Sequence, residues 1–141
     1  MTVPIDALMP VLSDVLERMA FAEVSLSELA PDWAVDTLVW SRIELRGPVF
    51  GALLIGASEA VMATLAESAW GGENDVADPA LAFTDELVNT VAGLLLVTLE
   101  PASEPSVGLP ISGRGPTQAP PGSVQLGVDV DGEFVGVALL S

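Results

Sequence analysis

The chain has 141 residues, of which 20 are Asp or Glu and four are Arg, with no Lys, His or Cys, so its formal charge is −16. The absence of Cys, His and Lys excludes disulfides, zinc sites, thiol or imidazole catalysis and a P-loop lysine. The negative charge disfavours nucleic acids and anionic membrane surfaces as partners. Half of the residues are hydrophobic, which predicts a folded core rather than a disordered chain.

The first half of the chain predicts one helix followed by a β-hairpin. Residues 6–21 carry apolar side chains at steps of three and four, the spacing of an amphipathic helix. Residues 24–33 are predicted to be a connection. Apolar and polar side chains alternate over residues 34–46, which is typical of a strand, and a Gly-Pro turn signal separates them from the apolar run 50–56. We expect these two runs to pair with each other.

Two further helices are predicted in the middle of the chain. Ser58 is a suitable N-cap for a helix over residues 59–70, which two glycines end. Asp78 followed by Pro79 is typical of a helix start, with the cap residue preceding proline at the first helical position. This third helix is expected to continue to about Leu99, where a Glu-Pro pair stops it.

The last third of the chain predicts a loop and a second hairpin. Residues 112–122 are rich in Pro, Gly and Ser and are predicted to form a flexible loop. Apolar residues alternate over 124–130 and again over 133–140, on either side of an Asp-Gly turn. The element order predicts an α/β two-layer fold with a largely antiparallel sheet and helices packed on it, and residues 1–141 are expected to form a single domain.

Neither a transmembrane helix nor a secretory signal peptide is expected. The apolar runs, of which 49–57 and 91–99 are the longest, are far shorter than the roughly 20 residues needed to span a bilayer. The first residues contain an early Asp6 and no basic cluster. We therefore expect a cytoplasmic protein that binds no membrane.

The third predicted helix carries the most informative polar residues. Glu86 and Asn89 are three positions apart and so lie on one side of a helix, and Gly93 follows four positions later on the same side. Glycine inside a helix costs roughly 1 kcal/mol relative to alanine, which suggests that something approaches the helix backbone closely there. The alternative is a solvated helix face that carries an acid, an amide and an incidental glycine.

The sequence Asp-Glu-Leu-Val-Asn-Thr-Val-Ala-Gly at residues 85–93, followed by Pro110, resembles the signature of the CheC/CheX chemotaxis phosphatase family. In that family a helix carries Glu and, three positions later, Asn, commonly with a Gly soon after. A Pro follows roughly twenty residues later at the start of a strand. The chain has one such helix, as in the CheX-like branch, and this similarity implies a homodimer.

The resemblance implies an activity: removal of the phosphoryl group from the aspartate of a CheY-type response-regulator receiver domain. It implies that Asn89 orients the attacking water and that Glu86 pairs with the active-site lysine of the receiver. Asp85 and Gly93 are expected in the contact with this partner. The chain would need no metal or cofactor of its own, because the receiver supplies Mg2+. Ala82 departs from the family pattern, which often has an acidic residue or Ser there.

Several alternatives remain open. The chain is either such a phosphatase, or a non-catalytic binding module of the same fold like the flagellar switch relatives, or an unrelated α/β domain. The acids of residues 73–78 suggest calcium but lack the spacing of an EF-hand. Residues 112–115 contain glycines but no Lys, so a mobile loop is expected rather than a phosphate site. Trp40 is expected either in the core or in an oligomer interface.

Overall fold

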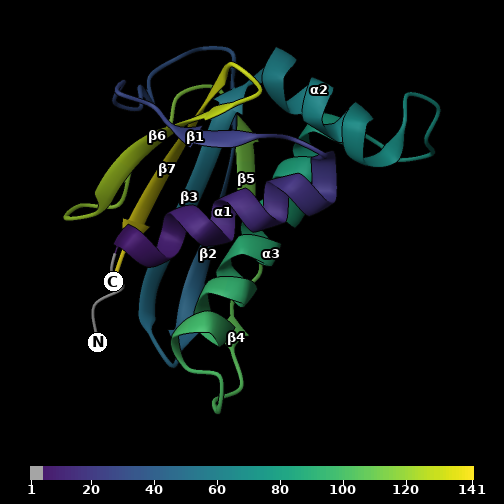
Figure 1. Ribbon diagram of the computed structural model, residues 1–141. Coiled ribbons are helices and arrows are strands. Elements are labelled where there is room, and N and C mark those ends of the chain that lie inside the picture. The colour runs from purple at the N-terminus through teal and green to yellow at the C-terminus, as the bar shows by residue number, and fades with distance from the viewer. Residues whose placement is uncertain (1–4) are drawn as a thin grey trace.

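The structure is a computed structural model that describes residues 5–141, and in this range three helices accompany a seven-stranded sheet (Figure 1). Helices α1 and α3 cover one face of the sheet, and α2 lies toward one end of it. The two-layer fold class predicted from the sequence is therefore confirmed. The elements are α1 (Ile5–Ala20), β1 (Val24–Leu26), β2 (Leu38–Gly47), β3 (Phe50–Ser58), α2 (Glu59–Trp70), α3 (Pro79–Leu99), β4 (Ser106–Val107), β5 (Ile111–Arg114), β6 (Val124–Val130) and β7 (Glu133–Leu140).

The sheet has the strand order β1-β6-β7-β3-β2-β4, with β5 also paired to β2, and its strand pairs are antiparallel. The two predicted hairpins are confirmed as β2–β3 and β6–β7. Strand β7 also pairs with β3, so it lies inside the sheet. This position explains why β7 is apolar on both faces, since a strand covered on both sides loses its alternation of apolar and polar residues.

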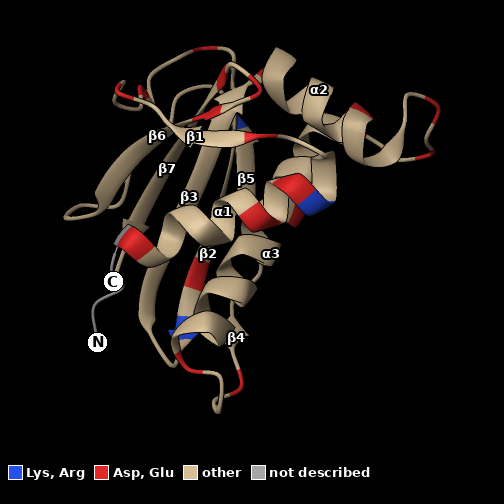
Figure 2. Ribbon diagram, viewed as in Figure 1, with Lys and Arg blue, Asp and Glu red and all other residues tan. Residues whose placement is uncertain are grey.

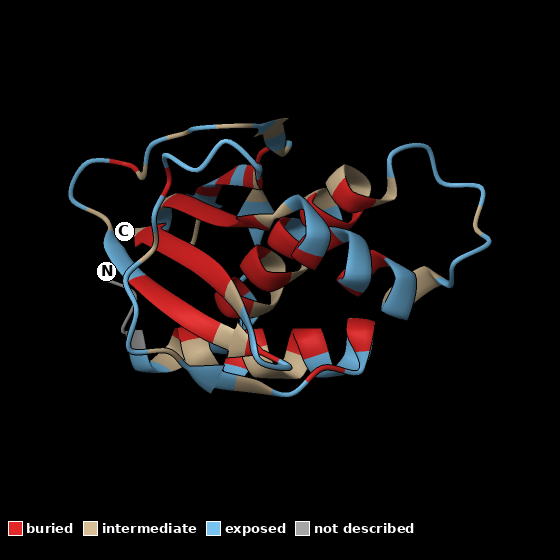
Figure 3. Ribbon diagram, turned by 90° about the horizontal axis from the view of Figure 1, so that it is seen from above, coloured by how far each residue is buried: buried red, intermediate tan, exposed pale blue. Residues whose placement is uncertain are grey.

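The main core lies between the sheet and the two helices that cross it. Figure 3 shows buried residues on the strands, whereas the helices have one buried and one exposed side. Removing these side chains from water is the main favourable contribution to folding. The largest fully buried side chains include Leu8, Leu12, Leu16, Ile43, Leu45, Leu53, Ile55, Met62, Phe83, Leu87 and Leu95.

A second, smaller cluster lies apart from the main core, on the opposite face of the sheet. It consists of Trp33, Leu38, Leu54 and Ala138, and the half-buried Trp40 packs against it. The loop that carries Trp33 approaches the sheet closely: a Cβ atom at Gly136 would lie 3.2 Å from the Trp33 ring. Loop and sheet therefore bury apolar residues on the face that the helices leave open.

Two strands lie where the sequence predicted irregular structure. Strand β1 lies within the predicted connection 24–33 and pairs with β6. Strand β5 includes most of the segment 112–115, within the predicted flexible loop, and pairs with β2. Strand β2 in turn begins at Leu38, four residues later than expected. Short strands of this kind depend on distant partners, which periodicity along the chain does not reveal.

Arg114 on β5 joins the starts of two helices. Its guanidinium donates to both carboxylate oxygens of Glu59, at 2.8 and 3.0 Å, and to both of Asp78, at 2.6 Å. Asp78 is the N-cap residue of α3 as predicted, but its side chain makes no capping hydrogen bond. Hydrogen bonds from Arg114 lower the pKa of the Asp78 carboxyl below its ordinary value. Residues 112–114 therefore belong to a strand that pairs with β2, where the sequence predicted a mobile loop.

Helix α3 is long and apolar enough, by length and composition alone, to cross a membrane. Half of the most apolar stretch of this helix is nevertheless buried inside the protein. It packs against β2, α1 and α2, which accounts for its apolar character as that of a core helix.

Candidate functional site

Helix α3 presents one exposed stripe of residues on the side away from its buried side chains. Glu86, Asn89 and Val97 are exposed, and the other two members of the stripe, Ala82 and Gly93, are half-buried. Steps of three and four residues place all five on one side of the helix. The apolar side chains that face the core set this orientation: Phe83, Leu87, Val88, Val91, Leu95 and Leu96 are fully buried.

The carboxylate of Glu86 has no cationic partner among the described residues. Within the described residues the carboxylate accepts a single, long hydrogen bond of 3.4 Å from the hydroxyl of Thr90, one turn further along α3. The side chain lies at a shallow hollow that it lines together with Met19, Ala69, Trp70 and Thr90. A negative charge in this position is available to a cation from outside the chain.

The amide of Asn89 is likewise free, since it makes no hydrogen bond within residues 5–141. The side chain is exposed one turn from Glu86, on the same stripe. A free amide offers both a donor and an acceptor, which are the two functions needed to hold a water molecule. The structure thus brings the two predicted catalytic residues together on one accessible surface.

Asp85 has a different environment from its neighbour Glu86. It is half-buried, and one of its carboxylate oxygens accepts a hydrogen bond of 2.7 Å from the hydroxyl of Ser41 on β2. Ser41 is fully buried. The pair links α3 to the sheet beneath it, so one oxygen of Asp85 is already engaged by the chain's own fold. Ser41 and Asp85 are 44 residues apart in the sequence, so no local pattern reveals this pair.

Gly93 faces open space. A Cβ atom added there would meet nothing within 4 Å, so no described part of the chain requires a glycine at this position. The expectation that another element approaches the helix closely is therefore wrong for this chain's own elements. Gly93 instead lines the α1–α3 groove, a hollow of about 390 Å³ formed by Asp14, Val15, Arg18, Met19, Thr90, Gly93, Leu94, Val97 and Pro105.

Pro110 immediately precedes strand β5, at Ile111–Arg114, which runs beside β2 and packs near α3. The preceding turn is held by a hydrogen bond of 2.9 Å from the Gly108 amide to the Glu44 carbonyl. Pro110 therefore stands at the start of a strand next to the helix of Glu86 and Asn89. This is the arrangement expected from the sequence signature.

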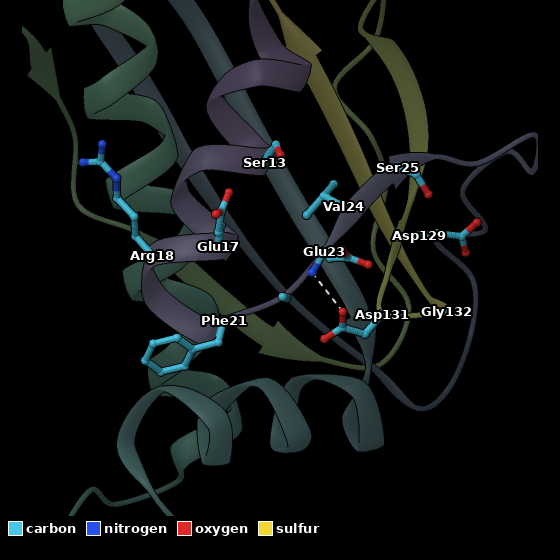
Figure 4. A pocket seen from close by; sticks show the side chains of 11 residues that line it. Ser13, Glu17, Arg18, Phe21, Glu23, Val24, Ser25, Asp129, Asp131 and Gly132 are labelled. Carbon is cyan, nitrogen blue, oxygen red and sulfur yellow. Dashed lines mark hydrogen bonds between the residues drawn. The ribbon is translucent and has the colours of Figure 1, made fainter.

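Another hollow lies where the end of α1 meets β1 and β6. Figure 4 shows the carboxylates of Glu17, Glu23, Asp129 and Asp131 around it, in a space of about 860 Å³. The backbone amide of Glu23 donates to Asp131 at 2.8 Å. Within residues 5–141 no group of three or more His, Cys, Asp or Glu side chains is arranged to hold a metal ion, either at this hollow or at residues 73–78.

No protein-family model matches the sequence, and no curated protein is significantly similar to it. Solved structures do match, over nearly the whole chain. Chemotaxis protein CheX from Vibrio vulnificus is 14% identical with a TM-score of 0.73, covering 96% of this chain and 93% of that one. A CheC-like superfamily protein from Shewanella sp. PV-4 is 18% identical with a TM-score of 0.71, and 97% of each chain is covered.

The structure of a CheX–CheY–BeF3–Mg2+ complex from Borrelia burgdorferi also matches, with 20% identity and a TM-score of 0.67, covering 98% of this chain and 97% of that one. The similarity to these proteins shows that the chain has the fold of CheX and CheC-like proteins. The resemblance expected from residues 85–93 and Pro110 is confirmed in the fold.

Proposed function

We propose that the protein is a phosphatase that dephosphorylates the phospho-aspartate of a CheY-type receiver domain, in chemotaxis or a related two-component circuit. The observation that carries the proposal is the exposed stripe of α3, where Glu86 and Asn89 lie one turn apart, with an unpaired carboxylate and a free amide. The fold supports it, because a protein of this fold has been solved in a complex with CheY.

In the proposed reaction, the amide of Asn89 holds a water molecule in line with the phosphoryl group. The water oxygen forms a bond to phosphorus while the bond from phosphorus to the aspartyl oxygen breaks. The products are inorganic phosphate, the unmodified aspartate side chain of the receiver and a proton. Such transfer depends on positioning more than on a strong base. A neutral amide also avoids repelling the phosphoryl oxygens, as a carboxylate would.

Glu86 would anchor the complex by pairing with the active-site lysine of the receiver. Charge-assisted hydrogen bonds between a carboxylate and an ammonium group are short and strong, and they fix orientation. The chain supplies no cofactor in this proposal, because Mg2+ belongs to the receiver. Because the receiver supplies the lysine and the metal ion, a chain that contains no Lys, His or Cys can still catalyse the reaction in this proposal.

The decisive experiment is a dephosphorylation assay on a phosphorylated CheY-type receiver from the same cell. Wild-type protein should accelerate phosphate loss, and Asn89→Ala should reduce the rate to near background without changing thermal unfolding. Gln118→Ala serves as the matched control, because Gln118 is another exposed amide that lies outside α3. Equal rates for the wild type and Asn89→Ala would contradict the proposal.

A second candidate function is a non-catalytic receiver-binding module of the same fold. Ala82 favours it, because this position on the exposed stripe lacks the acidic or Ser side chain often found in the family pattern. Such a module would form a complex with the receiver and leave its dephosphorylation rate unchanged. Binding without acceleration would therefore select this function.

The proposal includes a homodimer and a cytoplasmic location, as the resemblance implies. The sheet offers unpaired edges at β1 on one side and at β4 and β5 on the other. Backbone groups along an open edge can pair with a second chain. Light scattering of the purified protein would measure a mass of two chains, whereas the mass of one chain at assay concentrations would contradict the homodimer.

A further inference from the structure

We propose that the α1–α3 groove receives an apolar side chain of the receiver, one that lies next to the cation bound by Glu86. Helix α1 then forms the second wall of the docking surface, and affinity for the receiver depends on it as well as on α3. This inference rests on the proposed function and extends it. It assigns a second region of the chain, separate from Glu86 and Asn89, to recognition of the receiver.

The groove is continuous with the proposed site. Met19 and Thr90 line both the α1–α3 groove and the hollow beside Glu86. A partner that places a cation on Glu86 therefore lies at one end of the groove. The apolar walls of the groove come from both helices and from the segment that follows α3: Val15, Met19, Leu94, Val97 and Pro105.

The charges around the groove indicate which chemical group fits each part. Arg18 at the rim is paired with Asp14 at 3.0 Å, one turn earlier on α1, so these two charges compensate each other. Among the residues that line the groove and the hollow beside it, Glu86 is the charge left without an ion pair, because no Arg within residues 5–141 contacts it. The surface thus accepts one cation at Glu86 and a neutral apolar group beside it.

The groove also has the space for such a group. Gly93 removes one side chain from its floor, and the missing Cβ would meet nothing within 4 Å. Val97 at its edge remains 40% exposed, although it is a large apolar residue. Covering these residues would bury apolar surface, which offsets the repulsion between a chain of charge −16 and the carboxylates around a receiver's active site.

Val97→Asp tests the groove because it places a charge on the apolar wall and leaves Glu86 and Asn89 intact. We expect the KM for the phosphorylated receiver to rise about tenfold, which corresponds to about 1.4 kcal/mol, while kcat at saturation stays unchanged. Val124→Asp is the matched control, since Val124 is a similarly exposed valine at the start of β6. Val97→Thr should shift KM in the same direction by less, with little effect on folding.

An unchanged KM for both Val97 variants, relative to the wild type and Val124→Asp, would overturn the inference. A binding titration with a receiver that carries bound beryllofluoride and Mg2+ measures affinity without catalysis. It therefore separates a failure of the groove from a failure of the proposed function. If the wild type binds the charged receiver without accelerating dephosphorylation, weaker binding by Val97→Asp than by Val124→Asp supports the groove. Equal binding by the two variants, or no binding by the wild type, overturns it.

Discussion

The hydrogen bond between Ser41 and Asp85 joins the helix of the proposed site to the sheet. Asp85 directly precedes Glu86, so the bond helps to hold the rotation of α3 that turns Glu86 and Asn89 to the solvent. Ser41 is fully buried and Asp85 is half-buried, so loss of either side chain leaves its partner in a place that solvent reaches at most in part. A buried polar group that loses its partner carries its full desolvation penalty.

We therefore predict that Ser41→Ala lowers the free energy of unfolding by about 1–3 kcal/mol. Urea unfolding of the single variants Ser41→Ala and Asp85→Ala and of the double variant measures the coupling between the two residues. The double variant should lose less free energy of unfolding than the two single variants lose together, because it leaves no polar group unpaired. Additive losses would show that the two side chains do not interact in solution.

Within helix α3, the stability of the helix and the space for a docking partner make opposite demands on the residue at position 93. A glycine inside a helix weakens it by roughly 1 kcal/mol relative to alanine. The described chain offers no packing reason for this cost, because a Cβ atom at Gly93 would meet nothing within 4 Å. Space for a partner on the surface of α3 is a reason consistent with the proposed docking.

Gly93→Ala should accordingly raise the free energy of unfolding by about 1 kcal/mol and weaken binding to the receiver. Chemical unfolding and titration with a charged receiver measure the two effects on the same preparation. Opposite signs are the expected result, because the added methyl group favours the helix but occupies the docking surface. A stabilised variant that binds as well as the wild type would show that the partner does not reach Gly93.

The cluster of Arg114, Glu59 and Asp78 connects three elements: β5, the start of α2 and the start of α3. Arg114 lowers the pKa of Asp78 below its ordinary value of 3.8. The ionised carboxylate is therefore favoured in the folded state. Its stabilising effect is complete above pH 3.8, the unfolded value, and is lost as the pH falls through the lowered pKa.

Asp78→Asn should therefore be less stable than the wild type at pH 6, and the difference should shrink below the ordinary carboxyl pKa of 3.8. Urea unfolding midpoints at several pH values between 6 and 2.5 measure this convergence. The side chains of the cluster are 43–48% exposed, so solvent screens the effect and it should be modest. A difference that stays constant down to the lowest pH would exclude the ion pair as its cause.

The protein carries a formal charge of −16, and its Asp and Glu residues are distributed over helices, strands and loops (Figure 2). Three of the four Arg side chains are already paired with carboxylates: Arg18 with Asp14, Arg46 with Glu44, and Arg114 with Glu59 and Asp78. In the proposed complex, attraction to a receiver with an acidic active site would therefore come from local contacts such as Glu86 with a lysine, rather than from the net charge.

Raising the salt concentration should weaken receiver binding, because salt screens this local attraction. The dissociation constant measured between low and physiological ionic strength should therefore increase for the wild type. For Glu86→Gln it should change much less, since that variant lacks the charge. Tighter binding at higher salt would instead show that repulsion between the two proteins dominates.

Local patterns in the sequence were sufficient for much of the fold. Periodicity and turn signals predicted the three helices and the hairpins β2–β3 and β6–β7, because helix faces and tight turns depend on residues close together in the chain. The same reasoning placed Glu86 and Asn89 on one side of a helix, since that relation follows from helical geometry alone.

The tertiary structure decided the features that depend on residues far apart in the chain. The strands β1 and β5 are too short to show a pattern and exist through pairing with β6 and β2. The contact of Ser41 with Asp85 and the cluster around Arg114 likewise join distant residues. The sequence by itself determined which helix carries the proposed site. Packing decided that its stripe faces the solvent beside an apolar groove, because only the folded chain brings α1 next to α3.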